Sequence, residues 1–181
     1  MAPILDPKFC SRCGSPMSKS IPPGDSRPRP VCGACGFVHY LDPKVACGCV
    51  VDLDGRLALI RRAIPPQKGF WSFPCGFMEV DETTEAAAVR ETKEETGLDV
   101  ALEGHLGTYS YPDSFYGGSV VVVVYAARAT GGTPKADDDV DEIRLVPPAE
   151  IPWDRLAFRS SVAALRDWLR RRGLDAPPGT G

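Results

Sequence analysis

The sequence predicts an α/β protein: a three-layer α/β/α sandwich with a mixed sheet, preceded by a small module built on four cysteines. Two C-x-x-C pairs stand near the N-terminus, strand-like runs surround one strong helix over residues 45–146, and another helix follows at 160–172. Helices that lie between and after strands are typical of layered α/β domains. A length of 181 residues suits one domain with a small appendage.

The N-terminal cysteines predict a metal site. The pairs Cys10/Cys13 and Cys32/Cys35 are separated by 18 residues. Each C-x-x-C turn can present two thiolates, and four thiolates satisfy tetrahedral Zn²⁺. A glycine follows each pair and allows the backbone to turn there. We therefore expect a structural zinc ribbon rather than a thioredoxin-type redox pair.

Composition and charge limit the binding partners and the cellular compartment that are expected for this protein. The net charge is −3, and the basic residues around the cysteines are scattered, so a nucleic-acid partner is not expected. Seven cysteines is an odd number, which fits a reducing cytoplasm better than a secreted disulfide framework. The N-terminus lacks a signal-peptide pattern, and the longest apolar run, Val120–Ala127, is far shorter than the ~20 residues of a membrane helix.

The strands are predicted from apolar runs and turn signals. Val45–Leu53 and Arg56–Arg61 flank Asp54-Gly55, which is a strong hairpin signal. A short strand is expected at Trp71–Phe73, followed by a turn from Pro74 to Gly76. Further strands are expected near Leu106–Tyr111, Ser119–Arg128 and Glu142–Val146. The valine run 120–124 suits a central strand that is buried on both faces.

Two helices are predicted from their composition and their ends. Residues 84–96 are rich in alanine, with Thr83 or Thr84 available as N-cap and Gly97 placed to end the helix. The second helix, at 160–172, is ended by Gly173. Residues 174–181 are expected to form a flexible tail.

The first helix carries an acidic face. At 100° per residue, Glu91, Glu94 and Glu95 fall within about 100° of one another. Like charges at this spacing are destabilising, so a cation among them explains the pattern better than a solvated helix face does. Oxygen ligands favour Mg²⁺ or Mn²⁺. Thr92 and Thr96 can face the sheet, so we expect that the glutamates need not be buried. Glu82 can approach the same ion or pair with Arg90.

The spacing of this stretch resembles the Nudix box, G-x5-E-x7-R-E-U-x-E-E-x-G-U. The matching residues are Gly76, Glu82, Arg90, Glu91, Glu94, Glu95, Gly97 and Leu98. Only Thr92 departs, at a position that is usually apolar. The resemblance implies a zinc ribbon over residues 1–39, a Nudix hydrolase domain over 40–173 and the tail beyond it.

This resemblance also implies a chemistry. Nudix hydrolases use divalent metal ions to hydrolyse the pyrophosphate bond of nucleoside diphosphate derivatives, here releasing AMP and a second phosphate product. The implied Mg²⁺ or Mn²⁺ ligands are the carbonyl of Gly76 and the carboxylates of Glu82, Glu91, Glu94 and Glu95. Arg90 is expected to orient a box glutamate. The general base often comes from a loop outside the box, and the candidates are Glu142 and its acidic neighbours in the run 137–142.

Similarity beyond the box indicates the substrate class. Segments 40–44, 69–74 and 151–158 resemble zinc-ribbon Nudix pyrophosphatases acting on ADP-ribose, FAD or NADH. The S-Q-P-W-P-F-P type segment of the NADH branch is replaced here by residues 110–116, which favours ADP-ribose or FAD. The expected substrate contacts are stacking by Phe70, Phe77, Phe115 and Tyr116 and a phosphate contact from Arg61 or Arg62.

Two alternatives remain open. A nucleoside triphosphate house-cleaning hydrolase would not be expected to carry the ribbon and the 151–158 segment. A non-catalytic nucleotide-sensing or RNA-binding Nudix module would be expected to lose glutamates of the box, and all are present. A homodimer is possible because it is common among relatives.

Overall fold

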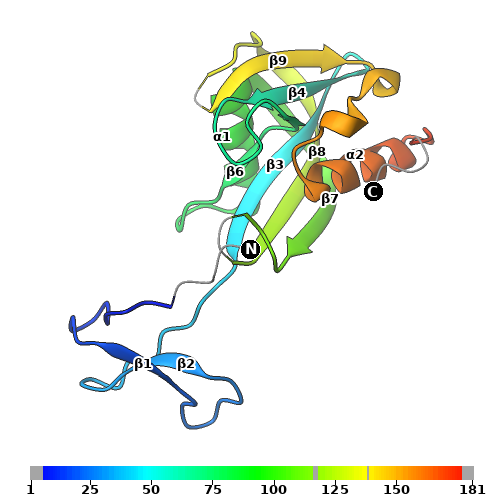
Figure 1. Cartoon of the computed structure of the whole chain (residues 1–181). Helices are drawn as coiled ribbons and strands as arrows, with labels where there is room; N and C mark the ends of the chain where they lie inside the picture. The colour runs from blue at the N-terminus through cyan, green and yellow to red at the C-terminus, as the bar shows by residue number, and fades with distance from the viewer. Residues whose placement is uncertain (1–5, 116–117, 138, 177–181) are drawn as a thin grey trace. The chain divides into compact units, whose positions relative to one another are not determined.

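The computed structural model describes residues 6–115, 118–137 and 139–176 (Figure 1). The chain divides into two compact units. One holds the residues up to 43 together with segment 112–119, and the other holds residues 44–111 and those from 120 onward. The boundaries 1–39, 40–173 and 174–181 stay a prediction.

The first unit contains a two-stranded antiparallel sheet. Strands β1 (Met17–Ser20) and β2 (Arg29–Cys32) pair in a register that sets Met17 opposite Cys32. Cys10 and Cys32 are buried, while large apolar side chains such as Phe9 are exposed. This unit therefore has little apolar core of its own, as expected for a small metal-stabilised module.

The second unit is built on a mixed seven-stranded sheet. Its strands are β3 (Lys44–Leu53), β4 (Arg56–Arg62), β5 (Trp71–Ser72), β6 (Cys75–Phe77), β7 (Leu98–Tyr111), β8 (Val120–Gly132) and β9 (Val140–Val146). The strand order is β5-β4-β3-β8-β7, with β6 paired to β3 and β9 paired to β4. β3 and β8 run parallel, and the other pairs are antiparallel.

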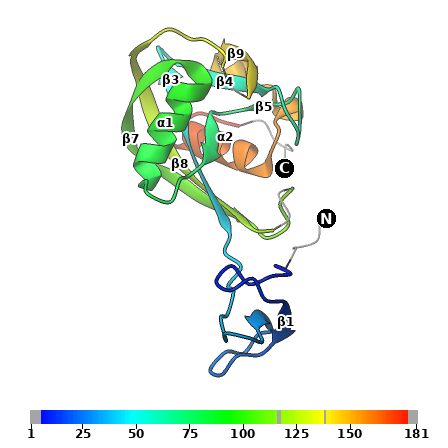
Figure 2. The same ribbon diagram turned by 90° about the vertical axis from the view of Figure 1, so that its left-hand side faces the viewer.

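Two helices cover opposite faces of this sheet (Figure 2). Helix α1 (Thr84–Thr96) packs its alanines against Cys47, Cys49 and Val51 of β3. Helix α2 (Arg159–Arg171) packs against the alternate β3 residues Ala46 and Val50. Since successive side chains of a strand point to opposite faces, this alternation defines an α1 side and an α2 side of the sheet. The α/β/α arrangement predicted from the sequence is confirmed.

The C-terminal segment before α2 runs along β5. It contains two short 3₁₀ helices, η1 (Pro148–Glu150) and η2 (Trp153–Arg155). The N–H of Ala157 donates to the carbonyl of Trp71 at 2.7 Å. Residues 151–158 are therefore held beside the end of β4 and β5.

The hairpin, both helices and the central position of β8 are confirmed. Asp54 and Gly55 have φ of 51° and 80°, the backbone that a tight hairpin turn requires. In β8 the valines on the α2 side are buried, whereas Val121 and Val123 are half-buried. The valine run of β8 is therefore buried on its α2 face and only half-buried on its α1 face.

Two predicted strand positions were wrong. Residues 75–77 form β6 rather than a turn, because β3 offers backbone partners to this segment. β7 begins at Leu98, well before the predicted start. Most residues between 99 and 105 are partly or wholly exposed, so pairing with β8 rather than an apolar pattern makes them a strand. Among the described residues, no helix is long and apolar enough to cross a membrane.

Candidate functional site

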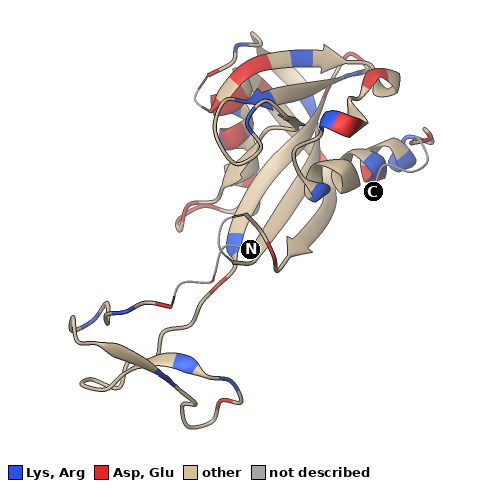
Figure 3. Ribbon diagram, in the orientation of Figure 1, with Lys and Arg blue, Asp and Glu red and all other residues tan. Residues whose placement is uncertain are grey.

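Helix α1 places the acidic face, and its ends are fixed by local chemistry. The side chain of Thr83 accepts a hydrogen bond from Ala86 N, and Gly97 ends the helix with φ of 69°. Thr92 is fully buried, and its hydroxyl donates to the carbonyl of Ala88 at 2.7 Å. A hydroxyl is thus accommodated at the usually apolar box position because its hydrogen bond is satisfied within the helix. In Figure 3 acidic residues crowd α1, whereas α2 carries mainly basic ones.

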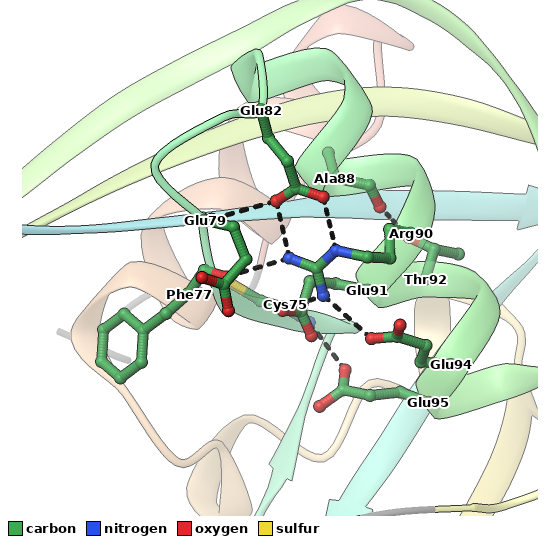
Figure 4. Close-up of polar contacts among 10 residues, drawn as sticks. All are labelled: Cys75, Phe77, Glu79, Glu82, Ala88, Arg90, Glu91, Thr92, Glu94 and Glu95. Atoms are coloured by element: carbon green, nitrogen blue, oxygen red, sulfur yellow. Dashed lines mark hydrogen bonds and ion pairs between the residues drawn. The ribbon is translucent and has the colours of Figure 1, made fainter.

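Arg90 lies at the centre of the carboxylates (Figure 4). Its guanidinium binds both oxygens of Glu82, at 2.6 and 2.8 Å. Nη1 also donates to Glu91 at 2.8 Å and to Glu94 at 2.9 Å, and Nη2 donates to the carbonyl of Phe77 at 3.1 Å. One cation therefore orients three carboxylates and the strand that precedes the helix, as expected for an arginine that positions a box glutamate.

Gly76 is required by the close approach of α1. It lies in β6, opposite Cys47 of β3. A Cβ built on Gly76 would overlap the carboxylate of Glu91. The absence of a side chain lets the backbone of β6 and the Glu91 carboxylate lie against each other, which brings the Gly76 main chain into the carboxylate cluster.

Glu95 is only 5% exposed, so the expectation that the glutamates need not be buried was wrong for this residue. One of its oxygens accepts a hydrogen bond from Cys75 N at 2.8 Å. Burial raises the pKa of Glu95 to about 8, with further increases from Glu91 and Asp139 and opposing effects from Cys75 N and Arg62. Burial likewise raises the pKa of Glu91. A helical wheel gives the direction of each side chain, but it does not show how deeply the last turn of α1 is buried between the sheet and the loops.

This donor set fits a hard divalent cation. It consists of oxygen atoms, and the two most buried carboxylates, those of Glu91 and Glu95, have raised pKa values because their negative charge lacks solvation. A cation there would restore the charged forms. In the described arrangement the oxygens of Glu82, Glu91 and Glu94 turn toward Arg90, and they do not form a group of ligand atoms as compact as the cysteine cluster.

Two predicted residues lie elsewhere. Arg61 pairs with Asp141 and Glu142, both at 2.7 Å, and Glu142 also pairs with Arg144 at 2.9 Å. Both arginines lie over the ring of Trp71, which packs on the α2 side of the sheet. Arg61 and Glu142 therefore pair with each other, and no ion pair among the described residues joins either of them to a carboxylate of α1. Their roles in substrate binding and as general base stay predictions.

The predicted aromatic residues differ in their surroundings. Phe77 is 37% exposed, and the ammonium of Lys44 lies 4.9 Å from its ring centre. Phe70 packs under the guanidinium of Arg155, 4.9 Å from the ring centre. Phe115 is exposed and belongs to segment 112–119 of the first unit. Tyr116 lies outside the described residues. Stacking by these side chains stays a prediction.

Sequence reasoning missed the backbone and charge environment of Glu95. Cys75 contributes its N–H, and Arg62 and Asp139 act on Glu95 electrostatically. Arg62 could have been found from strand alternation, because Ala58 packs on the α1 side and Arg62 lies four residues along the same strand. Asp139 belongs to the acidic run 137–142 from which the general base was expected, although the sequence did not indicate that its charge acts on Glu95.

The four N-terminal cysteines form a compact group. Their Sγ atoms all lie within 4.8 Å of one another, with Cys10 to Cys35 at 3.7 Å and Cys13 to Cys32 at 3.5 Å. Four thiolates at the Zn–S distance of about 2.3 Å have neighbouring sulfurs about 3.8 Å apart, so the spacing suits tetrahedral zinc. Hydrogen bonds from Ser15 lower the pKa of Cys13 to about 6, which favours the thiolate that a metal needs.

Both cysteine knuckles share one backbone form. Gly14 N donates to the carbonyl of Cys10 at 2.9 Å, and Gly36 N donates to that of Cys32 at 3.0 Å. The two glycines have φ of 72° and 71°. The predicted backbone role of these glycines is therefore confirmed, and the cluster is consistent with a zinc ribbon.

Comparisons with known proteins agree with this geometry. The family profile described as NUDIX domain matches residues 42–169, and the profile described as Nudix N-terminal, a zinc ribbon, matches residues 8–41. The chain is 39% identical over 131 residues to ADP-ribose pyrophosphatase of Methanocaldococcus jannaschii, covering 72% of this chain and 76% of that protein. It is 29% identical over 133 residues to the NAD-capped RNA hydrolase NudC of Vibrio atlanticus, covering 72% of this chain and 45% of NudC.

A solved structure is similar over nearly the whole chain. The crystal structure of a NUDIX hydrolase from Nitrosomonas europaea superposes with a TM-score of 0.83 at 35% identity, covering 94% of this chain and 96% of that one. The similarity thus includes the N-terminal module as well as the sheet and its helices.

Proposed function

Because this chain belongs to the Nudix hydrolase family, whose members act on pyrophosphate bonds, we propose that it hydrolyses ADP-ribose to AMP and ribose phosphate. The observation that carries the proposal is the cluster of carboxylates beside the main chain of Gly76, in which Arg90 holds Glu82, Glu91 and Glu94 and Cys75 N holds Glu95. The substrate is suggested by the 39% identity to an ADP-ribose pyrophosphatase.

The carboxylates and the Gly76 carbonyl would hold Mg²⁺ or Mn²⁺. When bound, the metal supplies positive charge for the pyrophosphate oxygens and lowers the pKa of the attacking water. Arg90 holds Glu91 and Glu94 through Nη1, so these two side chains are ordered before the substrate arrives. Cys75 N fixes one oxygen of Glu95 and thereby orients the other. Water adds to one phosphorus, the bridging P–O bond breaks, and each product leaves with one phosphate.

The residue that accepts the proton of the attacking water is open to direct test. Glu142 is the residue favoured by the sequence, yet its carboxylate is engaged by Arg61 and Arg144. Asp139 is a second acid, and its charge acts on Glu95. A base that acts in the chemical step should lower kcat by about 10² or more when replaced, and should remove the acidic limb of the pH–rate profile. Comparing Glu142→Gln with Asp139→Asn distinguishes the two residues.

The decisive assay measures AMP release with Mg²⁺ from ADP-ribose, FAD, NADH and ATP in parallel. We expect ADP-ribose to have the highest kcat/KM. Glu95→Gln should lower turnover by several orders of magnitude, while Glu150→Gln, at an exposed position of η1, should leave it unchanged. Preferred turnover of ATP would overturn the substrate assignment. Unchanged turnover in Glu95→Gln would overturn the site.

A further inference from the structure

Gly48 is a glycine in the middle of a buried strand. It lies in β3 between Cys47 and Cys49, and it is itself buried. Glycine weakens a strand interior, because it loses more conformational entropy on folding and offers no side chain to the core. Its φ lies outside the left-handed region, so the backbone conformation does not require glycine here. The reason for glycine at this position is therefore the space beside it.

That space is filled by the main chain of β6 and the residue before it. A Cβ built on Gly48 would overlap the carbonyl oxygen of Pro74, and it would lie 2.6 Å from Cβ and 2.9 Å from Cα of Cys75. Backbone atoms cannot turn aside as the end of a flexible side chain can. Phe73 and Pro74 are buried as well, so this segment has little room to withdraw. β6 can therefore lie this close to β3 because residue 48 has no side chain.

One peptide group connects β3 to Glu95. The carbonyl oxygen of Pro74 accepts a hydrogen bond from Cys49 N at 3.1 Å, and the N–H of Cys75 donates to Glu95 Oε2 at 2.8 Å. That carbonyl and that N–H belong to the same planar trans peptide, so they point in opposite directions and move together. A displacement of the Pro74 oxygen therefore displaces the hydrogen-bond donor of Glu95.

This connection matters because Arg90 does not hold Glu95. The guanidinium of Arg90 pairs instead with the other three acidic residues of the site, Glu82, Glu91 and Glu94. Among the described residues, Cys75 N is the hydrogen-bond donor that reaches the Glu95 carboxylate. The most buried of these carboxylates is thus oriented by the backbone of β6 and not by the arginine.

We propose that Gly48 is a positioning residue for Glu95 and acts through the Pro74–Cys75 peptide. By leaving room for the Pro74 oxygen, it keeps the Cys75 N–H directed at one carboxylate oxygen, and the other oxygen stays available to a divalent cation. Replacement of a group that orients a metal ligand typically costs about 10–100-fold in metal affinity or activity. The inference rests on the proposed function only in taking Glu95 as a ligand of the metal.

The test replaces Gly48 with alanine in the zinc-loaded protein. The Kd for Mn²⁺ is measured by electron paramagnetic resonance, and kcat and KM are measured with ADP-ribose at saturating metal. We expect Gly48→Ala to raise the Kd for Mn²⁺ at least about tenfold and to lower kcat, while KM changes less than about threefold.

Gly107→Ala is the matched control. A Cβ at Gly107 also crowds its surroundings, but it meets the side chain of Tyr109 on β7, two strands away from β3. Both changes add one methyl group to a tightly packed strand of the same sheet, and thermal unfolding is followed for each. Gly107→Ala should bind Mn²⁺ as the wild type does, because its crowding does not reach Glu95.

Two further measurements separate positioning from a general loss of stability. Hydrogen exchange followed by NMR should show a protected Cys75 amide in the wild type and faster exchange of that amide in Gly48→Ala. In a Glu95→Gln background, Gly48→Ala should add little to the Kd for Mn²⁺, because its effect passes through Glu95. If Gly48→Ala does not fold, Gly48→Ala combined with Cys75→Gly removes the overlap with the Cys75 Cβ and keeps that with the Pro74 oxygen. This double variant should also bind Mn²⁺ more weakly than the wild type.

The outcomes distinguish this inference from the proposed function. An unchanged Kd for Mn²⁺ in folded Gly48→Ala or in the folded double variant would overturn the inference and leave the hydrolase activity intact. So would equal effects of Gly48→Ala in the wild-type and Glu95→Gln backgrounds, or a Cys75 amide that exchanges freely in the wild type. Mn²⁺ binding that depends on Gly48 through Glu95, in a protein that does not hydrolyse ADP-ribose, would support the inference and overturn the proposed function.

Discussion

Arg90 and Glu82 form a two-point ion pair, with Nε to Oε1 at 2.6 Å and Nη2 to Oε2 at 2.8 Å. Glu82, which precedes α1 in the chain, also accepts a hydrogen bond from Glu79 N at 3.0 Å. The pair therefore ties the loop before α1 to the middle of the helix. It leaves Nη1 of Arg90 for Glu91 and Glu94.

This pair predicts a pH-dependent stability difference for Glu82→Gln. The hydrogen bonds from Arg90, followed by that from Glu79 N, lower the pKa of Glu82 to about 2, below the unfolded value near 4.5. The wild type should therefore be more stable than the variant above pH of about 4.5, and the difference should disappear as the pH falls toward 2. Chemical unfolding of both proteins at each pH measures it, and the comparison cancels effects of acid on the zinc site. A pH-independent difference would contradict the ion-pair explanation.

Glu95→Gln should stabilise the protein when magnesium is withheld. Burial raises the pKa of Glu95 from 4.5 to about 8. The folded state binds this proton more tightly than the unfolded state does. As the pH rises from about 4.5 to about 8, the unfolded state loses the proton first, so the free energy of unfolding falls; above about pH 8 the loss is complete. We expect Glu95→Gln to be about 2–4 kcal/mol more stable at pH 8.5 and nearly equal to the wild type at pH 4. Thermal unfolding without chelator keeps the zinc site intact.

Magnesium supplies the control for that prediction. Saturating Mg²⁺ should raise the unfolding temperature of the wild type and should raise that of Glu95→Gln much less, because a ligand of the ion has been removed. Equal magnesium stabilisation of both proteins would mean that Glu95 is not a ligand.

Gly76→Ala should impair both the fold and the site. The added methyl group would overlap the Glu91 carboxylate, so either β6 or Glu91 must shift. We expect a loss of about 1–3 kcal/mol in unfolding free energy and a fall in kcat of at least about tenfold. Gly33→Ala is the matched control, because a Cβ there meets nothing within 4 Å. Equal effects of the two changes would argue against the close packing of Gly76.

Removal of the cysteine cluster should act on stability rather than on chemistry. Cys10→Ser removes one of four sulfurs that lie within 4.8 Å of one another. We expect zinc content to fall from about one ion per chain to nearly none and the first unit to lose its protection from proteolysis. Cys47→Ala, at a buried position of β3 outside the cluster, should keep its zinc. Lost activity in a zinc-free protein whose sheet domain is folded would show that the ribbon acts in catalysis.

Much of the fold follows from local sequence. The hairpin at Asp54-Gly55, the capped helix α1 and the two cysteine knuckles depend on residues close together in the chain, and all three were predicted. β6 and the start of β7 were not, because their strand form depends on distant partners. The strand propensity of a short segment predicts its conformation poorly where pairing with a distant strand determines the backbone conformation.

The sequence by itself determined the family, the acidic helix and the cysteine cluster, since each depends on residue type at fixed spacing. Only the tertiary structure decided that Glu95 is buried and that Glu142 pairs with Arg61. The physical reason is that burial and ion pairing depend on which face of a sheet another element covers. That arrangement is set by packing between segments far apart in the chain.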